Sequence, residues 1–481
     1  MPGTPIPTAL NRPPSPPNSP FPASDRVCTE TRRCGVCICG RSRMVTEHEA
    51  TGRRIAALAL PALGVLAAQP IYLLLDTAVV GRLGTLPLAG LAIGGLILSM
   101  VSSQLTFLSY GTTSRSARFF GAGDRAAAVG EGVQATWLAL AAGLLITGLI
   151  EVFAVPLLRV IGGATVGAAA LPWLRIAILG APAILVSMAG NGWLRGVQDT
   201  VRPLRYVLAG VVVSAVLCPV LVFGWGVPRL GLIGSAIANL AGQWVAALLF
   251  ARALRAERAA LRPRPRVLAA QLALGRDLLA RSLAFQVCFL SAGAAVARFG
   301  AVSVAAYQIV LQLWNFLALV LDSLAIAAQS LVGAALGAGA DRPAMIVARR
   351  VTLFSFAAAT ILALILAAGA PVIPRLFTAD PQVLARIGVP WWFMVGQLPV
   401  AGIVFALDGV LVGAGDVAFL RKATLISALL GFLPMIWLSL AQGSGVTGIW
   451  AGLSLFLVLR LVFVGWRAVS GRWAVPGSAD R

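Results

Sequence analysis

The sequence predicts an all-α membrane protein whose twelve transmembrane helices form two six-helix bundles related by a parallel internal repeat. Three observations lead to this prediction. The 481 residues are 59% hydrophobic and only 11% charged, whereas a soluble domain is about 45–50% apolar and about 25% charged. The apolar residues form long runs, and blocks of the first half recur in the second half with a nearly constant spacing.

The apolar runs predict the spans. A helix needs about 20 apolar residues to cross about 30 Å of hydrocarbon, and twelve runs from Ile55 onward are long enough. The expected spans are 55–80, 87–113, 127–155, 168–191, 204–225, 230–253, 276–297, 304–336, 346–370, 385–412, 421–441 and 445–468.

Basic residues predict the orientation of these spans. Most of them lie in the gaps after even-numbered spans and at the two ends, and the largest block is RALRAERAALRPRPR, Arg252–Arg266. Positive residues stay cytoplasmic, so both termini are expected in the cytoplasm. The protein is expected to span the plasma (inner) membrane several times. The net charge of +21 is spread between apolar blocks, and therefore does not indicate nucleic acid. The Arg252–Arg266 block is expected to face lipid headgroups and not to form a binding site.

The N-terminal segment differs from the rest of the chain. Residues 1–43 are rich in Pro and Ser and are expected to be a disordered leader, because they cannot bury a core. Met44 begins a plausible membrane protein, so the leader is expected not to be translated, with a regulatory tail as the alternative. Four cysteines there lack histidine support, and no metal site is expected. The expected domains are therefore 1–43 (leader), 44–253 (first bundle), 254–275 (Arg-rich cytoplasmic linker) and 276–481 (second bundle).

The two halves repeat each other. GRLGTLPLAG at Gly81 matches ARFGAVSVAA at Ala297, and NGWLRGVQD at Asn191 matches DGVLVGAGD at Asp408. FFGAGDR and LPWLRI of the first half also have counterparts, in the same order. Six spans per half is an even number, so both halves insert with the same orientation, as in transporters built from parallel repeats. The major facilitator fold shares this arrangement, so topology alone does not name a family.

The local motifs narrow the family. From about Arg53 to Trp466 the chain resembles multidrug and toxic compound extrusion (MATE) transporters of the DinF-like branch. The resemblance is carried by Pro61 and Asp76 in the first span and by these motifs in order: GRLGTLPLAG, GAGD, NGWLRGVQDT, GLIGSAIAN, LDSLAIAAQSLVGAALGAG, LDGVLVGAGD and GVTGIWAGL. It implies two six-helix bundles around a central cavity, in which cation uptake drives drug export.

The resemblance also implies a coupling site. The family's carboxylate falls on Asp76, a polar residue below it on Gln69, and the polar residue of the sixth helix on Asn239. Relatives often carry Asn and Asp in the fifth helix, where this chain has Ser214 and Cys218. This departure puts a sodium site with several carboxylates in doubt and is expected to leave Asp76 more isolated.

The residues of QPIYLLLDTAVVG support the same site. An ionised Asp at the centre of a membrane helix costs about 2.5–3.5 kcal/mol, and burial disfavours its charged form, so Asp76 is expected to carry a proton. The alternative is a carboxylate satisfied by neighbours without a coupling role. Gln69 lies seven residues earlier on the same helical face. Pro61 and Pro70 interrupt helical hydrogen bonds and are expected to form either a hinge or a static kink.

A substrate cavity is expected from polar residues within other spans. Asp322 and Asp408 are the other deeply placed acids and would supply counter-charges to cationic drugs. Asn191 is the repeat partner of Asp408, and Tyr307 and Gln308 lie in the eighth span. The alternatives are helix capping for Asp408 and packing for Tyr307.

The expected function is secondary antiport, with amphipathic or cationic molecules leaving in exchange for protons or sodium by alternating access. A lipid-linked precursor flippase is the alternative. It would need a basic cavity, and the acids of the spans together with a lack of mid-span arginines argue against it. A membrane enzyme would need a nucleophile, base or metal cluster, which the sequence does not suggest. The chain carries no Walker motif. No cofactor or nucleic acid is expected, and the protein is expected to be a monomer whose partners are membrane lipid and small-molecule substrates.

Overall fold

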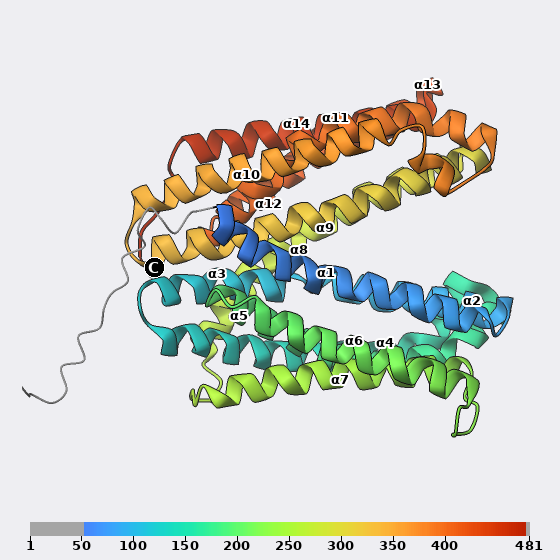
Figure 1. Cartoon of the computed structure of the whole chain (residues 1–481), viewed down its shortest axis with the longest axis horizontal. Coiled ribbons are helices and arrows are strands. Elements are labelled where there is room, and N and C mark those ends of the chain that lie inside the picture. The colour runs from blue at the N-terminus through green and yellow to red at the C-terminus, as the bar shows by residue number, and fades with distance from the viewer. Residues whose placement is uncertain (1–51, 478–481) are drawn as a thin grey trace, which may run out of the picture. The chain divides into compact units, whose positions relative to one another are not determined.

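The computed structural model describes residues 52–477, and the regular elements of this part of the chain are helices (Figure 1). The expected leader and the start at Met44 lie outside the described residues. The helices are α1 Gly52–Gly81, α2 Thr85–Gln104, α3 Phe107–Gly121, α4 Arg125–Ile178, α5 Ala181–Gly196, α6 Val201–Phe223, α7 Leu232–Ala256, α8 Pro265–Ala297, α9 Ala301–Gly337, α10 Asp341–Ala368, the 3-10 turn η2 Ile373–Leu376, α11 Pro381–Gly413, α12 Val417–Ser427, the π turn η3 Ala428–Phe432, α13 Leu433–Gln442 and α14 Gly445–Val469.

The twelve-span prediction is confirmed once one long helix is divided. Among the described residues, 11 helical segments are long and apolar enough to cross a membrane. One of them, α4, has 54 residues and would be about 80 Å long at 1.5 Å per residue. Gly163 interrupts it with φ +66°, a conformation that glycine adopts without strain. The chain reverses there, so α4 supplies the third span and, with α5, the fourth.

Local signals explain several helix ends. The Asp124 carboxylate accepts a hydrogen bond from the amide of Ala127 at 2.8 Å, which caps the start of α4. Gly224 ends α6 in the left-handed conformation with φ 82°, as is usual after a helix. Short turns between long apolar helices follow from these caps.

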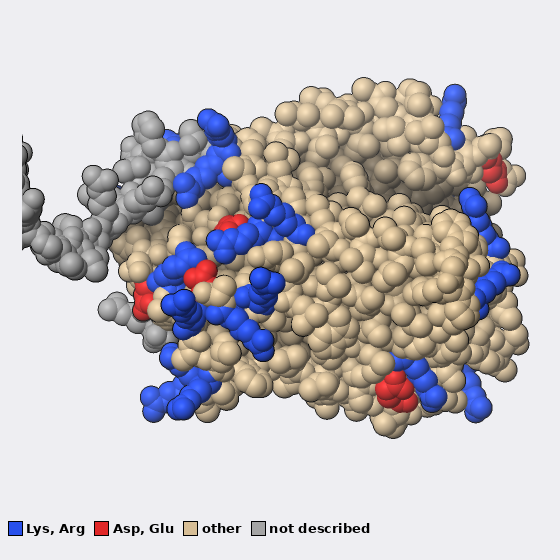
Figure 2. Space-filling model, turned by 60° about the horizontal axis from the view of Figure 1, so that its bottom comes forward, with Lys and Arg blue, Asp and Glu red and all other residues tan. Residues whose placement is uncertain are grey.

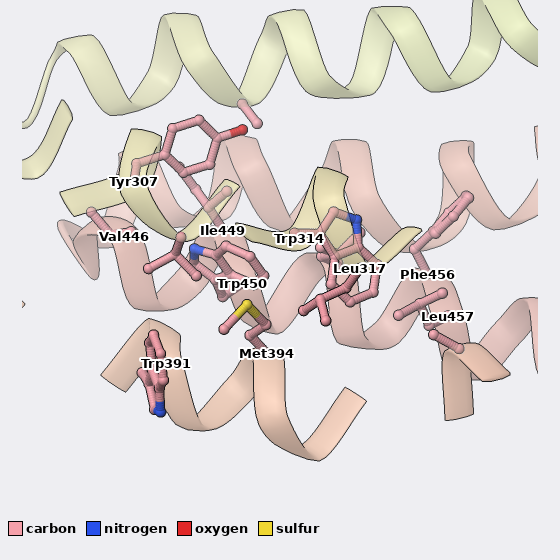
Figure 3. Close-up of a cluster of buried hydrophobic side chains, with 14 of the residues drawn as sticks. Tyr307, Trp314, Leu317, Trp391, Met394, Val446, Ile449, Trp450, Phe456 and Leu457 are labelled. Carbon is pink, nitrogen blue, oxygen red and sulfur yellow. The ribbon is translucent and has the colours of Figure 1, made fainter. Parts of the chain in front are cut away.

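The helices form two lobes, which we call the N-lobe (α1–α7) and the C-lobe (α8–α14). The C-lobe core contains Trp314, Trp391 and Trp450, and the rings of Trp314 and Trp450 meet edge to face with centroids 6.4 Å apart (Figure 3). In the N-lobe, Trp173 is buried in a separate apolar cluster. Each lobe therefore has its own core, as expected for a duplicated unit.

The connection between the lobes is shorter than expected and is held in place. Helix α8 begins at Pro265, so residues 265–275 of the expected 254–275 linker are helical, and residues 257–264 connect α7 to α8. Gln134 of α4 donates to the carbonyl of Arg262 at 2.9 Å and accepts from the amide of Arg264 at 2.7 Å. We call the end of the molecule that carries residues 257–264 the linker end.

The lobes meet at the linker end through a symmetric pair of glycine contacts. A Cβ on Gly121, at the end of α3, would lie 1.9 Å from the carbonyl oxygen of Ala334 on α9. A Cβ on Gly337, at the end of α9, would lie 1.9 Å from the carbonyl oxygen of Arg118 on α3. Gly121 corresponds to Gly337 in the sequence repeat, and Arg118 to Ala334. From this contact α1 and α9 diverge toward the opposite end (Figure 1).

Candidate functional site

Asp76 lies in the interior of the N-lobe. Tyr72, Asp76 and Val80 are the buried residues of the last three turns of α1, one turn apart on one face. Asp76 is 1% exposed, whereas Leu74 is 72% exposed. The carboxylate therefore points into the lobe while the other faces of this half of α1 remain uncovered.

Two uncharged groups hold the Asp76 carboxylate. The Ser235 hydroxyl of α7 donates to Asp76 Oδ1 at 2.6 Å, and the Cys218 thiol of α6 donates to the same oxygen at 3.2 Å. The indole of Trp173 donates to Ser235 Oγ at 3.2 Å, which orients the hydroxyl toward Asp76. The expectation that Cys218 leaves Asp76 more isolated is wrong, because the thiol is one of its partners.

A small cavity of about 40 Å³ lies one turn from Asp76, between α1, α5, α6 and α7. Gln69 and Tyr72 line it, and Tyr72 is buried. Gln243 of α7 donates to Gln69 Oε1 at 3.5 Å and to Asn239 Oδ1 at 3.4 Å. Gln69 and Asn239 are therefore joined through Gln243, and their hydrogen bonds do not reach Asp76 directly.

Helix α1 belongs to both lobes. Ile55 and Leu58 pack in a core cluster with C-lobe residues of α9, α10 and α11, whereas Val80 packs in the N-lobe cluster. Pro61 lies between these two segments, and Pro70 is exposed near the middle of the helix. Both prolines remove a helical hydrogen bond at a place where α1 changes its surroundings, and their role as a hinge stays a prediction.

A second polar cluster lies where the lobes meet. A cavity of about 120 Å³ is bounded by α3 of the N-lobe and by α8, α9 and α11 of the C-lobe, and both Asp322 and Asp408 line it. The Tyr110 hydroxyl of α3 donates to Asp322 Oδ2 at 2.6 Å, so this bond joins the two lobes. Arg195 and Arg281 interact electrostatically with Asp322.

Asp408 is paired with two arginines. Its Oδ2 accepts from Arg281 at 2.6 Å and from Arg460 at 2.7 Å. Arg460 is 2% exposed and lies in the middle of α14, 5.3 Å above the ring of Phe285. The expectation that the spans hold no central arginine is therefore wrong. Asp408 neither caps a helix end nor offers an unpaired counter-charge to a cation, because its charge is already balanced.

The remaining residues expected in the substrate cavity lie elsewhere. Asn191 is buried on α5 and lines neither of the two cavities. Tyr307 packs in the C-lobe core, where Figure 3 shows it near Val446 and Ile449. Gln308 is exposed on α9. Of the five expected residues, the structure brings Asp322 and Asp408 together.

Several residues of these sites were missed from the sequence. Arg460 had a readable signal, because it stands alone in the apolar run LFLVLRLVFVG and an ionisable residue inside a span is a functional candidate. Ser235 belongs to the motif GLIGSAIAN, but nothing in the motif distinguishes it from its small neighbours. Tyr110 and Gln243 carry no pattern that predicts their contacts.

Comparison with known proteins identifies the family. The family model MatE matches residues 61–220 and again residues 278–437, so the two lobes are two copies of one unit. Protein DETOXIFICATION 44, chloroplastic, of Arabidopsis thaliana is 33% identical in an alignment of 450 positions that covers 89% of this chain and 84% of the relative. DNA damage-inducible protein F of Escherichia coli (strain K12) is 31% identical in an alignment of 422 positions that covers 84% of this chain and 89% of the relative.

Solved structures share the fold. A MOP superfamily transporter from Pyrococcus furiosus aligns with a TM-score of 0.80 at 21% identity, over 89% of this chain and 99% of the other. An outward-facing multidrug resistance MATE family transporter aligns with a TM-score of 0.76 at 23% identity, over 87% and 96% of the two chains. With its two MatE repeats and its all-helical two-lobe fold, the chain belongs to the MATE family of drug and toxin efflux transporters.

Proposed function

We propose that this protein is a proton-coupled antiporter that exports amphipathic molecules, and that Asp76 is its proton carrier. The observation that carries the proposal is the position of Asp76, which is 1% exposed and is held by one hydroxyl and one thiol. A buried carboxylate without a cationic partner is costly in its ionised form. Proton uptake removes this cost, so the protonation state of Asp76 has a direct energetic link to the packing of α1.

The donor set favours a proton over sodium. Hard cations prefer several oxygen ligands, whereas Asp76 shares its pocket with the soft thiol of Cys218. Among the described residues, no group of three or more His, Cys, Asp or Glu side chains is placed to hold a metal ion. Sodium remains the alternative coupling ion, and we propose that no further cofactor is needed.

The arrangement of the two lobes supports alternating access and corresponds to one state of that cycle. We propose that the linker end faces the cytoplasm, because the Arg-rich segment lies there, and that the chain spans the plasma membrane as a monomer with both termini inside. The contacts of Gly121 and Gly337 then close the cytoplasmic side, and the diverging opposite end corresponds to the outward-facing state. Movement of α1 about Pro61, between its two lobes, would link the protonation of Asp76 to the change of state.

The cluster at the lobe interface bears on the substrate. Asp322 and Asp408 face Arg195, Arg281 and Arg460, so arginines outnumber acids. The apolar wall includes Phe107, Phe285 and Phe405. This combination suits amphipathic molecules and supplies no reason for an exclusive preference for cations.

Asp76→Asn tests the proposal. The variant mimics the protonated form, and it should reach the membrane in normal amount while losing proton-driven dye export in everted vesicles. Asp76→Glu should keep part of the activity with a changed pH optimum. Asp341→Asn, at an exposed site in the first turn of α10, is the matched control and should transport normally. Normal export by Asp76→Asn, with loss in Asp322→Asn, would place the coupling site in the C-lobe.

The buried arginines also support a second candidate function. Export or flipping of a lipid-linked precursor would use arginines to hold its phosphates. Arg281 lines the interface cavity, and Arg460 binds Asp408 of its wall. Each of them is already paired with Asp408, which makes this candidate the weaker one. Transfer of a fluorescent polyprenyl-diphosphate analogue across liposomes containing the protein would favour it over drug export.

A further inference from the structure

A large basic cavity lies at the linker end, next to the interface cavity but lined by different residues. Its volume is about 890 Å³, and it is bounded by α3, by the first turns of α8 and by the turn between α11 and α12. Small side chains on α8 and after α11, including Ala270, Ala273 and Gly415, leave the space open. Lys and Arg side chains gather over the linker end on the face that Figure 2 shows. The volume is within the range of small-molecule sites, about 300–1,000 Å³.

The charged walls of this cavity carry an excess of positive charge. Arg115, Arg118, Arg266 and Arg276 line it together with one acid, Asp277. Asp277 is engaged by Arg421, and Arg115 is paired with Glu131 at 2.7 Å. Counting these partners, five arginines face two carboxylates. An anion entering the cavity would therefore meet a positive potential.

Arg118 is half-buried, and its charge is met by neutral groups. Its Nη2 donates to the carbonyl of Ala414 and its Nη1 to the carbonyl of Gly477 at 3.4 Å. Its Nε is buried and has no acceptor among the described residues. A guanidinium whose charge is met only by carbonyl groups adds its positive charge to the cavity and favours an anion there.

The cavity lies at the depth of the lipid headgroups. Helix α8 has 33 residues and is about 50 Å long, which exceeds the roughly 30 Å of hydrocarbon. Its first turn, with Arg266 exposed, therefore extends to the membrane surface. Basic pockets between transmembrane helices at this level are typical sites for anionic headgroups.

The cavity also spans the seam between the lobes. Arg115 and Arg118 come from α3 of the N-lobe, whereas Arg266 and Arg276 come from α8 of the C-lobe. The carbonyl of Arg118 is also the group that contacts Gly337. An anion held by both sets of arginines would bridge the lobes only while the linker end is closed. A ligand with such a difference in affinity shifts the equilibrium toward the state that it binds.

We propose that this cavity binds a phosphate-bearing anion, as a lipid headgroup or a soluble phosphate ester, and that the bound anion stabilises the closed linker end. The proposal concerns regulation and does not depend on which ion or substrate is transported. The Arg252–Arg266 segment, which was not expected to form a binding site, then contributes Arg266 to one.

The binding test uses the full chain in two kinds of nanodisc, made of phosphatidylcholine alone or of phosphatidylcholine with phosphatidylglycerol. Inorganic phosphate is titrated into the nanodiscs of phosphatidylcholine alone. Phosphatidylglycerol or phosphate should raise the thermal midpoint. Arg266→Gln/Arg276→Gln changes two exposed positions and should weaken the apparent affinity at least tenfold. Arg252→Gln/Arg255→Gln removes the same charge from exposed positions at the same end, outside the cavity, and should behave as wild type.

The arms of the test separate the possible sources. If only phosphatidylglycerol raises the thermal midpoint, the ligand is a lipid headgroup. If inorganic phosphate also raises it, the site is open to soluble anions. The closure is read from spin labels at Ala126→Cys on α4 and Arg342→Cys on α10, two exposed positions, whose distance distribution should narrow with the anion. Absence of any shift, or equal shifts in the two double variants, overturns the proposal. An unchanged distance distribution on binding overturns the bridging role.

Discussion

A methyl group on Gly121 should open the linker end. In Gly121→Ala, the added Cβ would lie 1.9 Å from the carbonyl oxygen of Ala334, and about 1 Å of extra separation is needed to reach the 3.0 Å that real Cβ atoms keep. Backbone atoms form this contact, so no side chain can rotate away. Overpacking of this kind costs about 1–3 kcal/mol, and only the closed state bears the cost. The ratio of closed to open molecules should therefore fall roughly 5- to 150-fold.

The repeat supplies an internal replicate of this experiment. Gly337→Ala places its Cβ 1.9 Å from the carbonyl oxygen of Arg118, so it should open the linker end to a similar extent. Spin labels at positions 126 and 342 measure the change as a longer distance, and drug export should fall because the outward-facing state loses its seal. The double variant should not be additive, since the two contacts share one interface.

Gly130→Ala is the matched control for these substitutions. Gly130 lies within α4, and a Cβ there would meet nothing within 4 Å, so the variant should keep the wild-type distances and activity. The reasoning is refuted if Gly121→Ala and Gly337→Ala give the same distance distribution as Gly130→Ala, because the glycines would then not be needed for closure.

Three further predictions follow from the charged groups. Arg460→Met removes the hydrogen bonds of Arg460 to the buried Asp408, which keeps Arg281, and should cost about 1.5–3 kcal/mol, seen as a lower thermal midpoint in detergent, whereas Arg342→Met at an exposed site should not. Hydrogen bonds from Arg125 lower the pKa of Glu257, which follows α7 outside the spans. This contribution to the free energy of unfolding is complete above the ordinary Glu pKa of about 4.3. It is lost as the pH falls through the lowered pKa that Glu257 has in the folded protein. Glu257→Gln should therefore melt slightly below wild type at neutral pH, and the difference should disappear in acid. Reporter fusions after Ala260 should read cytoplasmic and fusions near Arg229 external, and the opposite pattern would reject the proposed orientation.

The span count and the position of Asp76 inside an apolar helix could be predicted from the sequence because both are visible in short segments. Runs such as LALAAGLLITGLI are apolar over the length of a span, and an Asp inside such a run is unusual wherever the helix packs. The duplication was also readable, and the two MatE matches, 61–220 and 278–437, confirm it. A break within α4 could be expected because its apolar residues extend over two spans. The sequence did not show that the break would fall at Gly163 and not at the adjacent Gly162.

The environment of the acids could not be predicted in the same way. Asp408 and Asp76 look alike in the sequence, each a single Asp in an apolar run. In the structure, Asp408 is paired with Arg460, 52 residues away, and with Arg281, 127 residues away. Asp76 instead meets Cys218 and Ser235.

The sequence by itself determined that this chain is a duplicated, twelve-span membrane protein, because hydropathy, charge placement and repetition are properties of local segments. Only the tertiary structure decided which buried carboxylate is balanced by arginines and which is held by uncharged donors. It also decided that two repeat-related glycines seal the linker end. These outcomes depend on which helices approach one another and on distances of a few ångströms between backbones and side chains, and no spacing along one chain encodes such distances directly.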